Sequence, residues 1–284
     1  MKTEHIYECQ NDEILLKCLY VQREKYSLAK RGMQGKIIIV FISTILSVVS
    51  LIYNCNELVI TTAVFAIWGL LIGKWLDMWI NSKKAEAAEI QQYFDVSLYS
   101  NVCSLSSGRW GNILTDSQVV EYIKSVPSMN LDHLKNWYSD YSKNESFKEI
   151  LKCQNVNVCW DSELRKNYIY IGYAVISLIL LFSAFCNNNI FIIISLLIPA
   201  LDYCISNIIL LDHDIKRLRN IRQKIISFEE KYEYINKTKK ISRLVEIQYM
   251  IKEHRANCVL IPDWFYKSKK EKQQKEADDA SQYS

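Results

Sequence analysis

Nine cysteines and four histidines are the side chains best suited to metal binding or nucleophilic chemistry, but their spacing supports neither. The cysteines form no C-x-x-C pair, so the sequence shows no zinc site. His213, between Asp212 and Asp214, fits a solvated helix start better than a metal ligand. Walker, dinucleotide-binding, H-E-x-x-H and G-x-S-x-G patterns are also absent. We therefore expect no catalytic residue, metal or cofactor, and no enzymatic activity.

Asp202 is the most unusual charged residue, because it interrupts a long apolar stretch over residues 190–211. An ionised carboxylate deep in a bilayer costs about 2.5 to 3.5 kcal/mol, so it should face protein or water. Pro199, one turn earlier, leaves a backbone carbonyl without its helical partner. Near the end of an earlier apolar stretch, Lys74 and Asp77 are three apart and are expected to pair as an interfacial anchor.

The elements that carry these residues are defined by composition. The chain has 284 residues, of which 50% are apolar and 23% charged, and its net charge is +4. Isoleucine, leucine and valine are concentrated in residues 37–80 and 168–211, each block divided by a short polar turn. Residues 37–53 alone span roughly 25 Å as a helix, close to the thickness of a hydrocarbon core. Core helices of a soluble protein usually keep a polar face, which these stretches lack. The pattern predicts four transmembrane helices in two tight hairpins.

Lysine and arginine are abundant beside the outer ends of both hairpins and absent from both hairpin turns. Such a bias places the flanking segments in the cytoplasm and the turns outside. The first span begins too far into the chain and is followed too soon by a partner helix to be a secretory signal. We expect a multi-pass membrane protein with both termini cytoplasmic.

Small and polar residues recur at helical spacing in three of the four spans. Such stripes mark close helix contacts in lipid. Ordinary packing within one four-helix bundle is one interpretation, and a face that packs between subunits and lines water is the other. The pore or helix-packing candidates are Ser43, Ser47, Gly69, Gly73, Ser195, Pro199, Asp202 and Ser206.

The remainder of the chain divides around the hairpins. We expect an N-terminal amphipathic helix in 1–36, transmembrane hairpins in 37–80 and 168–211, a cytoplasmic middle domain in 81–167, a cytoplasmic helical hairpin in 212–266 and a disordered tail in 267–284. The fold class is an all-α membrane protein whose middle domain is mainly helical with some α+β character. Alternating apolar residues from Phe94 to Leu105 suggest a short extended stretch there. Short helices are expected near 117–125, 131–138 and 145–154.

The region after the fourth span carries an apolar seam with spacings of four and three, interrupted by Arg222. Its members are Leu211, Ile215, Leu218, Ile225, Phe228, Tyr232 and Ile235. The seam either packs on the middle domain or drives oligomerisation. Cys55 and Cys186 stand at the two outer turns, so they are either unpaired thiols or, where the hairpins adjoin on an oxidising side, a disulfide.

Several short motifs surround the four spans in a fixed order. They are Gln22-Arg23 with Tyr26-Ser27-Leu28-Ala29-Lys30, Lys135-Asn136-Trp137-Tyr138, Cys159-Trp160-Asp161-Ser162-Glu163-Leu164-Arg165, His254-Arg255 and Pro262-Asp263-Trp264-Phe265-Tyr266. With the two hairpins, they resemble the SMODS-associated four-transmembrane effectors, a pore-forming family of bacterial anti-phage systems that signal by cyclic oligonucleotides. The resemblance extends to about Tyr266.

The resemblance implies a membrane effector that responds to a cyclic oligonucleotide from an associated nucleotidyltransferase, assembles with copies of itself, permeabilises the inner membrane and kills the infected cell. Its partners would be the lipid bilayer, further copies of the chain and the nucleotide, with no DNA or RNA. Phosphates and bases require cations and aromatic planes. The ligand candidates in the middle domain are Arg109, Trp110, Trp137, Tyr138, Trp160 and Arg165.

Two alternatives stay open. These aromatic and basic residues could instead be core or interfacial, and Asp161, Asp263, His254 and Arg255 could form a polar network that ties the C-terminal hairpin to the middle domain. The whole chain could also be a non-conducting membrane adaptor that recruits a cytoplasmic partner.

Overall fold

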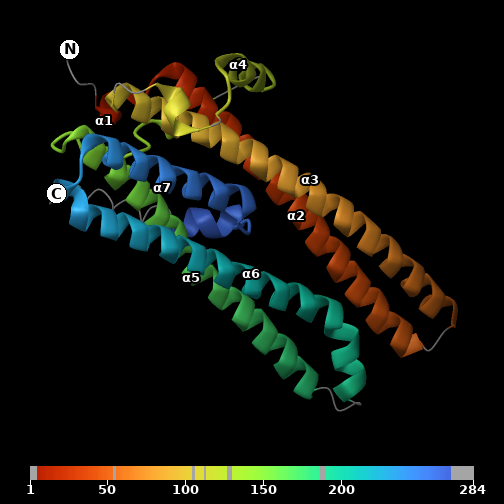
Figure 1. Ribbon diagram of the computed structural model, residues 1–284. Helices are drawn as coiled ribbons and strands as arrows, with labels where there is room; N and C mark the ends of the chain where they lie inside the picture. Colours follow the sequence, from red (N-terminus) through yellow and green to blue (C-terminus); the bar gives the residue numbers. More distant parts are fainter. Residues whose placement is uncertain are drawn as a thin grey trace.

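A computed structural model describes residues 5–53, 56–103, 106–111, 113–126, 130–185 and 190–269, without the side chains of 48, 51, 52, 182–185 and 190–199. Two pairs of long antiparallel helices diverge from a helical head (Figure 1). Hairpin 1 consists of α2 (Glu13–Tyr53) and α3 (Asn56–Cys103), and hairpin 2 of α5 (Ser146–Phe185) and α6 (Ile190–Lys231). The head contains the membrane-distal halves of these helices and a set of shorter elements. These elements are α1 (Ile6–Cys9), η1 (Ser107–Trp110), α4 (Asp116–Lys124), η2 (Asp132–Leu134), η3 (Tyr232–Tyr234) and α7 (Lys237–Asn257).

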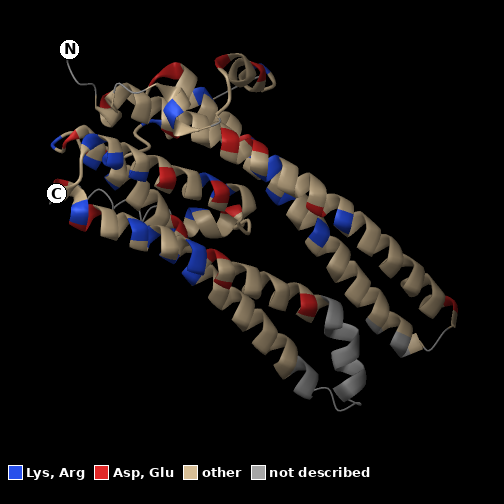
Figure 2. Ribbon diagram, viewed as in Figure 1, with Lys and Arg blue, Asp and Glu red and all other residues tan. Residues whose placement is uncertain are grey.

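The apolar halves of the hairpins are suited to lipid. Among the described residues, Asn56–Cys103 and Ser146–Leu181 are helices long and apolar enough to cross a membrane. Large apolar side chains there remain exposed, such as Phe41 at 66% and Leu70 at 70%. Charged residues are concentrated on the head and on the adjoining ends of the hairpins (Figure 2). A soluble protein would not leave such a large apolar surface in water, so a bilayer is the natural environment of these segments.

The described residues contain no strand, so the extended stretch expected from Phe94 to Leu105 is wrong over residues 94–103, and Leu105 lies outside the described residues. This region continues α3 as far as Cys103. Its helix is buried on several sides, and Phe94, Val96 and Leu98 are all fully enclosed. Burial around most of the circumference fills alternate positions with apolar residues, which imitates the period of a strand.

Other predicted helices differ from the structure mainly in length. The amphipathic segment 11–31 and the segment 145–154 are not separate helices, because α2 and α5 pass from the head into the apolar stretches without a break. The predicted helix over 131–138 is reduced to η2. The head portions and the apolar stretches of α2 and α5 therefore belong to the same continuous helices.

The head has one large apolar core, to which α2, α3, α5, α6 and α7 all contribute. The predicted seam on α6 lies in it at Leu218, Ile225 and Phe228, while Leu211 and Ile215 contact a second cluster nearer the membrane. Arg222 is exposed, and Ile221 occupies the buried position beside it. The seam therefore packs within the chain.

Candidate functional site

Helix α7 lies between the head portions of the two hairpins. Its N-terminus is capped by Asn236, whose side-chain oxygen accepts a hydrogen bond of 3.0 Å from the Lys239 amide. An apolar face of α7 is buried in the head, with Leu244 and Ile247 almost completely enclosed. Its last turn contains His254 and Arg255, which point to different sides because successive helical residues are about 100° apart. These two side chains join the hairpins.

Arg255 reaches hairpin 1. Its guanidinium lies 2.6 Å from the carboxylate of Asp95 on α3, which is fully buried. The same carboxylate accepts hydrogen bonds from the Tyr138 hydroxyl at 2.7 Å and the Gln248 amide at 3.0 Å. Burial, together with the Asp95 charge, raises the pKa of Tyr138 well above its usual value, so Tyr138 stays a donor. Asp95 is thus a buried anion held by one cation and two neutral donors.

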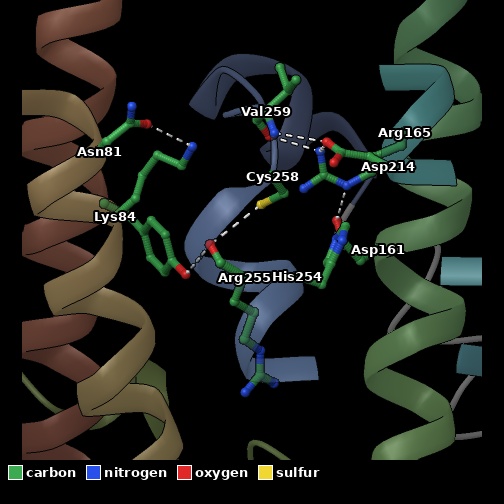
Figure 3. A network of polar contacts seen from close by, with 10 residues as sticks. Asn81, Lys84, Asp161, Arg165, Asp214, His254, Arg255, Cys258 and Val259 are labelled. Carbon is green, nitrogen blue, oxygen red and sulfur yellow. Dashed lines mark hydrogen bonds and ion pairs between the residues drawn. The ribbon is translucent and has the colours of Figure 1, made fainter. Parts of the chain in front are cut away.

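His254 reaches hairpin 2. Its Nε2 lies 2.6 Å from the carboxylate of Asp161 on α5, which also forms an ion pair of 3.0 Å with Arg165 (Figure 3). Burial disfavours ionisation of Asp161, but Arg165 and His254 outweigh it and hold the pKa of that carboxyl well below its usual range. The Asp161 carboxylate therefore remains charged throughout the physiological range of pH.

Arg165 extends this network to α6 and to the segment that follows α7. Its guanidinium donates to Asp214 on α6 at 2.8 Å and to the Val259 carbonyl at 2.8 Å. Asp214 also accepts from the Val259 amide at 2.8 Å. Both backbone groups of Val259 are therefore fixed to hairpin 2 by a buried ion pair (Figure 3).

The residues that follow, 258–266, form a strap that crosses both hairpins where the head meets the apolar stretches. Leu260 packs with Ala29 and Ile80 of hairpin 1. Ile261 and Phe265 pack with a cluster of hairpin 2 residues. Asp263 forms an ion pair with Lys30 of α2. The strap and the last turn of α7 together constitute a cross-brace between the hairpins.

Lys84 of α3 faces this cross-brace and is only 6% exposed. Its ammonium contacts the Asn81 side-chain oxygen at 3.3 Å, and no carboxylate in the described part of the chain lies within ion-pair distance of it. Burial lowers the pKa of Lys84. The cross-brace thus borders a cation that is poorly compensated.

The six ligand candidates do not converge on one site. Arg109 is exposed on η1, while Trp110 is buried against Tyr99, whose hydroxyl lies 3.4 Å from that of Tyr138. Trp137 is partly buried against the head core. Trp160 packs on Tyr266 of the strap with ring centroids 6.3 Å apart, and Arg165 belongs to the buried network.

The pore candidates also separate. Ser43 and Gly69 face each other across hairpin 1, since a Cβ added at Gly69 would lie 3.8 Å from the Ser43 hydroxyl. Ser47 donates to the Ser43 carbonyl of its own helix, and an added Cβ at Gly73 would meet nothing within 4 Å. Asp202 and Ser206 are exposed on α6, and the side chains of Ser195 and Pro199 lie outside the described residues.

The sequence predicted a pairing of Lys74 with Asp77 and left a disulfide between Cys55 and Cys186 open. Asp77 pairs with Lys36 of α2 at 2.7 Å, which corrects the expected pairing with Lys74. Cys18, Cys103, Cys153, Cys159, Cys204 and Cys258 are free thiols, while Cys55 and Cys186 lie outside the described residues. Over the described ranges, no group of three or more metal-binding side chains is present.

Several important residues were missed by the sequence analysis. Asp95 and Asp214 were not singled out as partners of basic residues, because their cations come from distant parts of the chain. Gly172 was also missed, although a Cβ added there would lie 2.8 Å from Ile208 Cγ1. A lone glycine within an apolar span was the available signal for this close contact.

Comparisons with known proteins agree with the membrane architecture. The chain is 26% identical over 277 residues to a protein of Bacillus cereus (strain VD146) named a probable CBASS effector molecule, and the match covers 91% of each chain. No solved structure matches. Residues 4–283 match the SMODS-associating 4TM effector domain. With its four predicted spans and the motifs that surround them, this chain belongs to the SMODS-associating 4TM effector family.

Proposed function

We propose that this chain is a membrane effector of anti-phage defence that permeabilises the bacterial inner membrane when its associated nucleotidyltransferase makes a cyclic oligonucleotide. The family description and the relative named as a probable CBASS effector support a role in such a signalling system. The chain itself performs no catalysis in this proposal. Both termini lie in the cytoplasm, and several copies assemble to open the membrane, which kills the infected cell.

The observation that carries this proposal is the cross-brace. Its charged contacts reach hairpin 1 through Asp95 and hairpin 2 through Asp161 and Asp214. All of these partners lie on helices that continue into the apolar stretches. A signal that displaces α7 would therefore change the relative position of the hairpins, which gives a two-state element that ligand binding can bias.

Assembly is supported by the outer surface of hairpin 2. Asp202 and Ser206 are one helical turn apart and both exposed on the single chain. An exposed carboxylate within an apolar segment needs a protein or aqueous environment, which neighbouring copies would provide. A ring of such carboxylates would favour cations in the resulting path.

The direct test is membrane depolarisation, followed with a potential-sensitive dye in cells that express the chain with its nucleotidyltransferase. We expect depolarisation with the active nucleotidyltransferase and none with a catalytically inactive variant. If neither strain depolarises although the chain is inserted and the cells are still protected from phage, pore formation is contradicted and the adaptor alternative is favoured. Reporter fusions at each terminus test the orientation, since activity from the periplasmic side would overturn it.

A further inference from the structure

A basic groove lies between the second half of α6 and the first half of α7. Its volume is about 550 Å³, within the usual range for small-molecule sites. Four cations line it, namely Lys224, Lys231, Lys239 and Arg243, with Glu246 as the one carboxylate of the lining. None of the six ligand candidates from the sequence belongs to this groove.

The groove is lined by more cationic side chains than carboxylates. Glu246 serves both Lys224 and Arg243, the latter at 2.9 Å. Lys231 and Lys239 have no carboxylate within ion-pair distance in the described part of the chain. Lys239 also lies in the first turn of α7, where the helix dipole adds positive potential. The groove is therefore an unneutralised site for a multiply charged anion.

We propose that this groove binds the phosphates of a cyclic oligonucleotide. Two unpaired lysines on facing helices suit a ligand with at least two phosphates. Phe228 and Ile247 provide an apolar floor, and Tyr234, next to the groove residue Ile235, is 89% exposed and available to stack on a base. The identity of the ligand rests on the proposed function, whereas the charge and volume of the groove do not.

The position of the groove favours a soluble ligand over a lipid headgroup. Residue 223 lies roughly 18 Å along α6 beyond the end of the apolar stretch at residue 211, at 1.5 Å per residue. From the groove, α6 leads directly to the fourth span, and α7 leads to His254 and Arg255. A ligand that draws the two helices together would act on the cross-brace.

The test is isothermal titration of the full-length protein in detergent with cyclic dinucleotides and cyclic trinucleotides. The groove variant combines Lys231→Glu with Lys239→Glu. The control combines Lys124→Glu with Lys143→Glu, which makes the same charge change at exposed head lysines outside the groove. We expect wild-type binding, retention in the control, and a loss of at least about 100-fold in the groove variant, roughly tenfold for each charge-assisted contact.

The proposal would be overturned if both variants weaken binding equally or if the groove variant binds as tightly as wild type. It would also be overturned if the protein binds no cyclic nucleotide, or binds only long RNA or anionic vesicles. Circular dichroism and thermal unfolding should show that both variants keep the wild-type fold. Because binding is measured without a membrane, the groove can be confirmed even where depolarisation fails, and the reverse also holds.

Discussion

The two membrane hairpins contain similar small and polar residues but use them for different contacts. In hairpin 1, the helices approach closely at Gly69, where an added Cβ would lie 3.1 Å from Ile39 Cγ2. In hairpin 2, the corresponding close contact is made by Gly172 against Ile208. Asp202 and Ser206 of hairpin 2 take no part in it and remain exposed. Gly69 therefore packs within hairpin 1, whereas Asp202 and Ser206 of hairpin 2 are left exposed.

The hairpins also differ in how the cross-brace holds them. In the head core, the cross-brace is tied to hairpin 1 by the pair of Arg255 and Asp95, whose carboxylate is fully buried and has Arg255 as its cation. Asp161 of hairpin 2 has both His254 and Arg165 as partners. Loss of one of these two partners should therefore be tolerated, because the remaining cation still neutralises the Asp161 carboxylate.

The largest effect is expected from Arg255→Ala. It leaves the buried Asp95 carboxylate without a cation and should lower the free energy of unfolding by about 3 to 5 kcal/mol. His254→Ala should cost only about 1 to 2 kcal/mol, because Asp161 keeps Arg165. Arg243→Ala, at an exposed pair, is the control and should cost about 1 kcal/mol or less. Denaturant unfolding in detergent measures all three, and equal losses at Arg255 and His254 would refute the difference between the ties.

A smaller effect is expected within hairpin 1. Gly69→Leu forces a side chain against α2 and should cost about 1 to 3 kcal/mol. Gly73→Leu enters open space and should change stability by about 0.5 kcal/mol or less. The two glycines form one G-x-x-x-G motif. Thermal unfolding of both variants therefore shows whether this motif serves a contact inside hairpin 1 at Gly69 or an interface that includes both glycines. Equal destabilisation would favour the shared interface.

Lys84→Met should raise the free energy of unfolding by about 0.5 to 2 kcal/mol near neutral pH, because it removes a buried and poorly compensated cation. The lowered pKa of Lys84 means that the unfolded chain binds the proton more tightly than the folded one. Wild-type stability should therefore rise as pH increases from that lowered pKa toward 10.5, and the gain from the substitution should shrink. Lys83→Met is the control. A gain that does not depend on pH would contradict this explanation.

The smallest effect on stability, about 0.5 kcal/mol or less, is expected for Asp202→Asn, since its side chain is exposed. Its effect should instead appear in ion leakage from liposomes, with a reduced preference for cations. Asp212→Asn, on the same helix outside the apolar stretch, should leave the preference unchanged. Identical leakage from wild type and Asp202→Asn would exclude Asp202 from the conducting path.

Several features of the fold were predictable because their signals are local. The apolar stretches, their charged borders and the short helix α4 follow from composition and capping within a few turns of chain. The extended stretch predicted at Phe94 to Leu105 was wrong over residues 94–103 because burial on many sides of a helix is decided by distant elements. The continuity of α2 and α5 was likewise not visible, since no signal distinguishes a long helix from two that adjoin.

The sequence by itself determined where the chain can enter lipid and which segments carry excess positive charge, because transfer free energies add along the chain. Only the tertiary structure decided which charges pair, since Asp95 and Arg255 lie 160 residues apart in the sequence. It also decided that the basic lining residues of α6 and α7 share one groove. Desolvation and ion pairing depend on distances in space, and those exist only after the helices have packed.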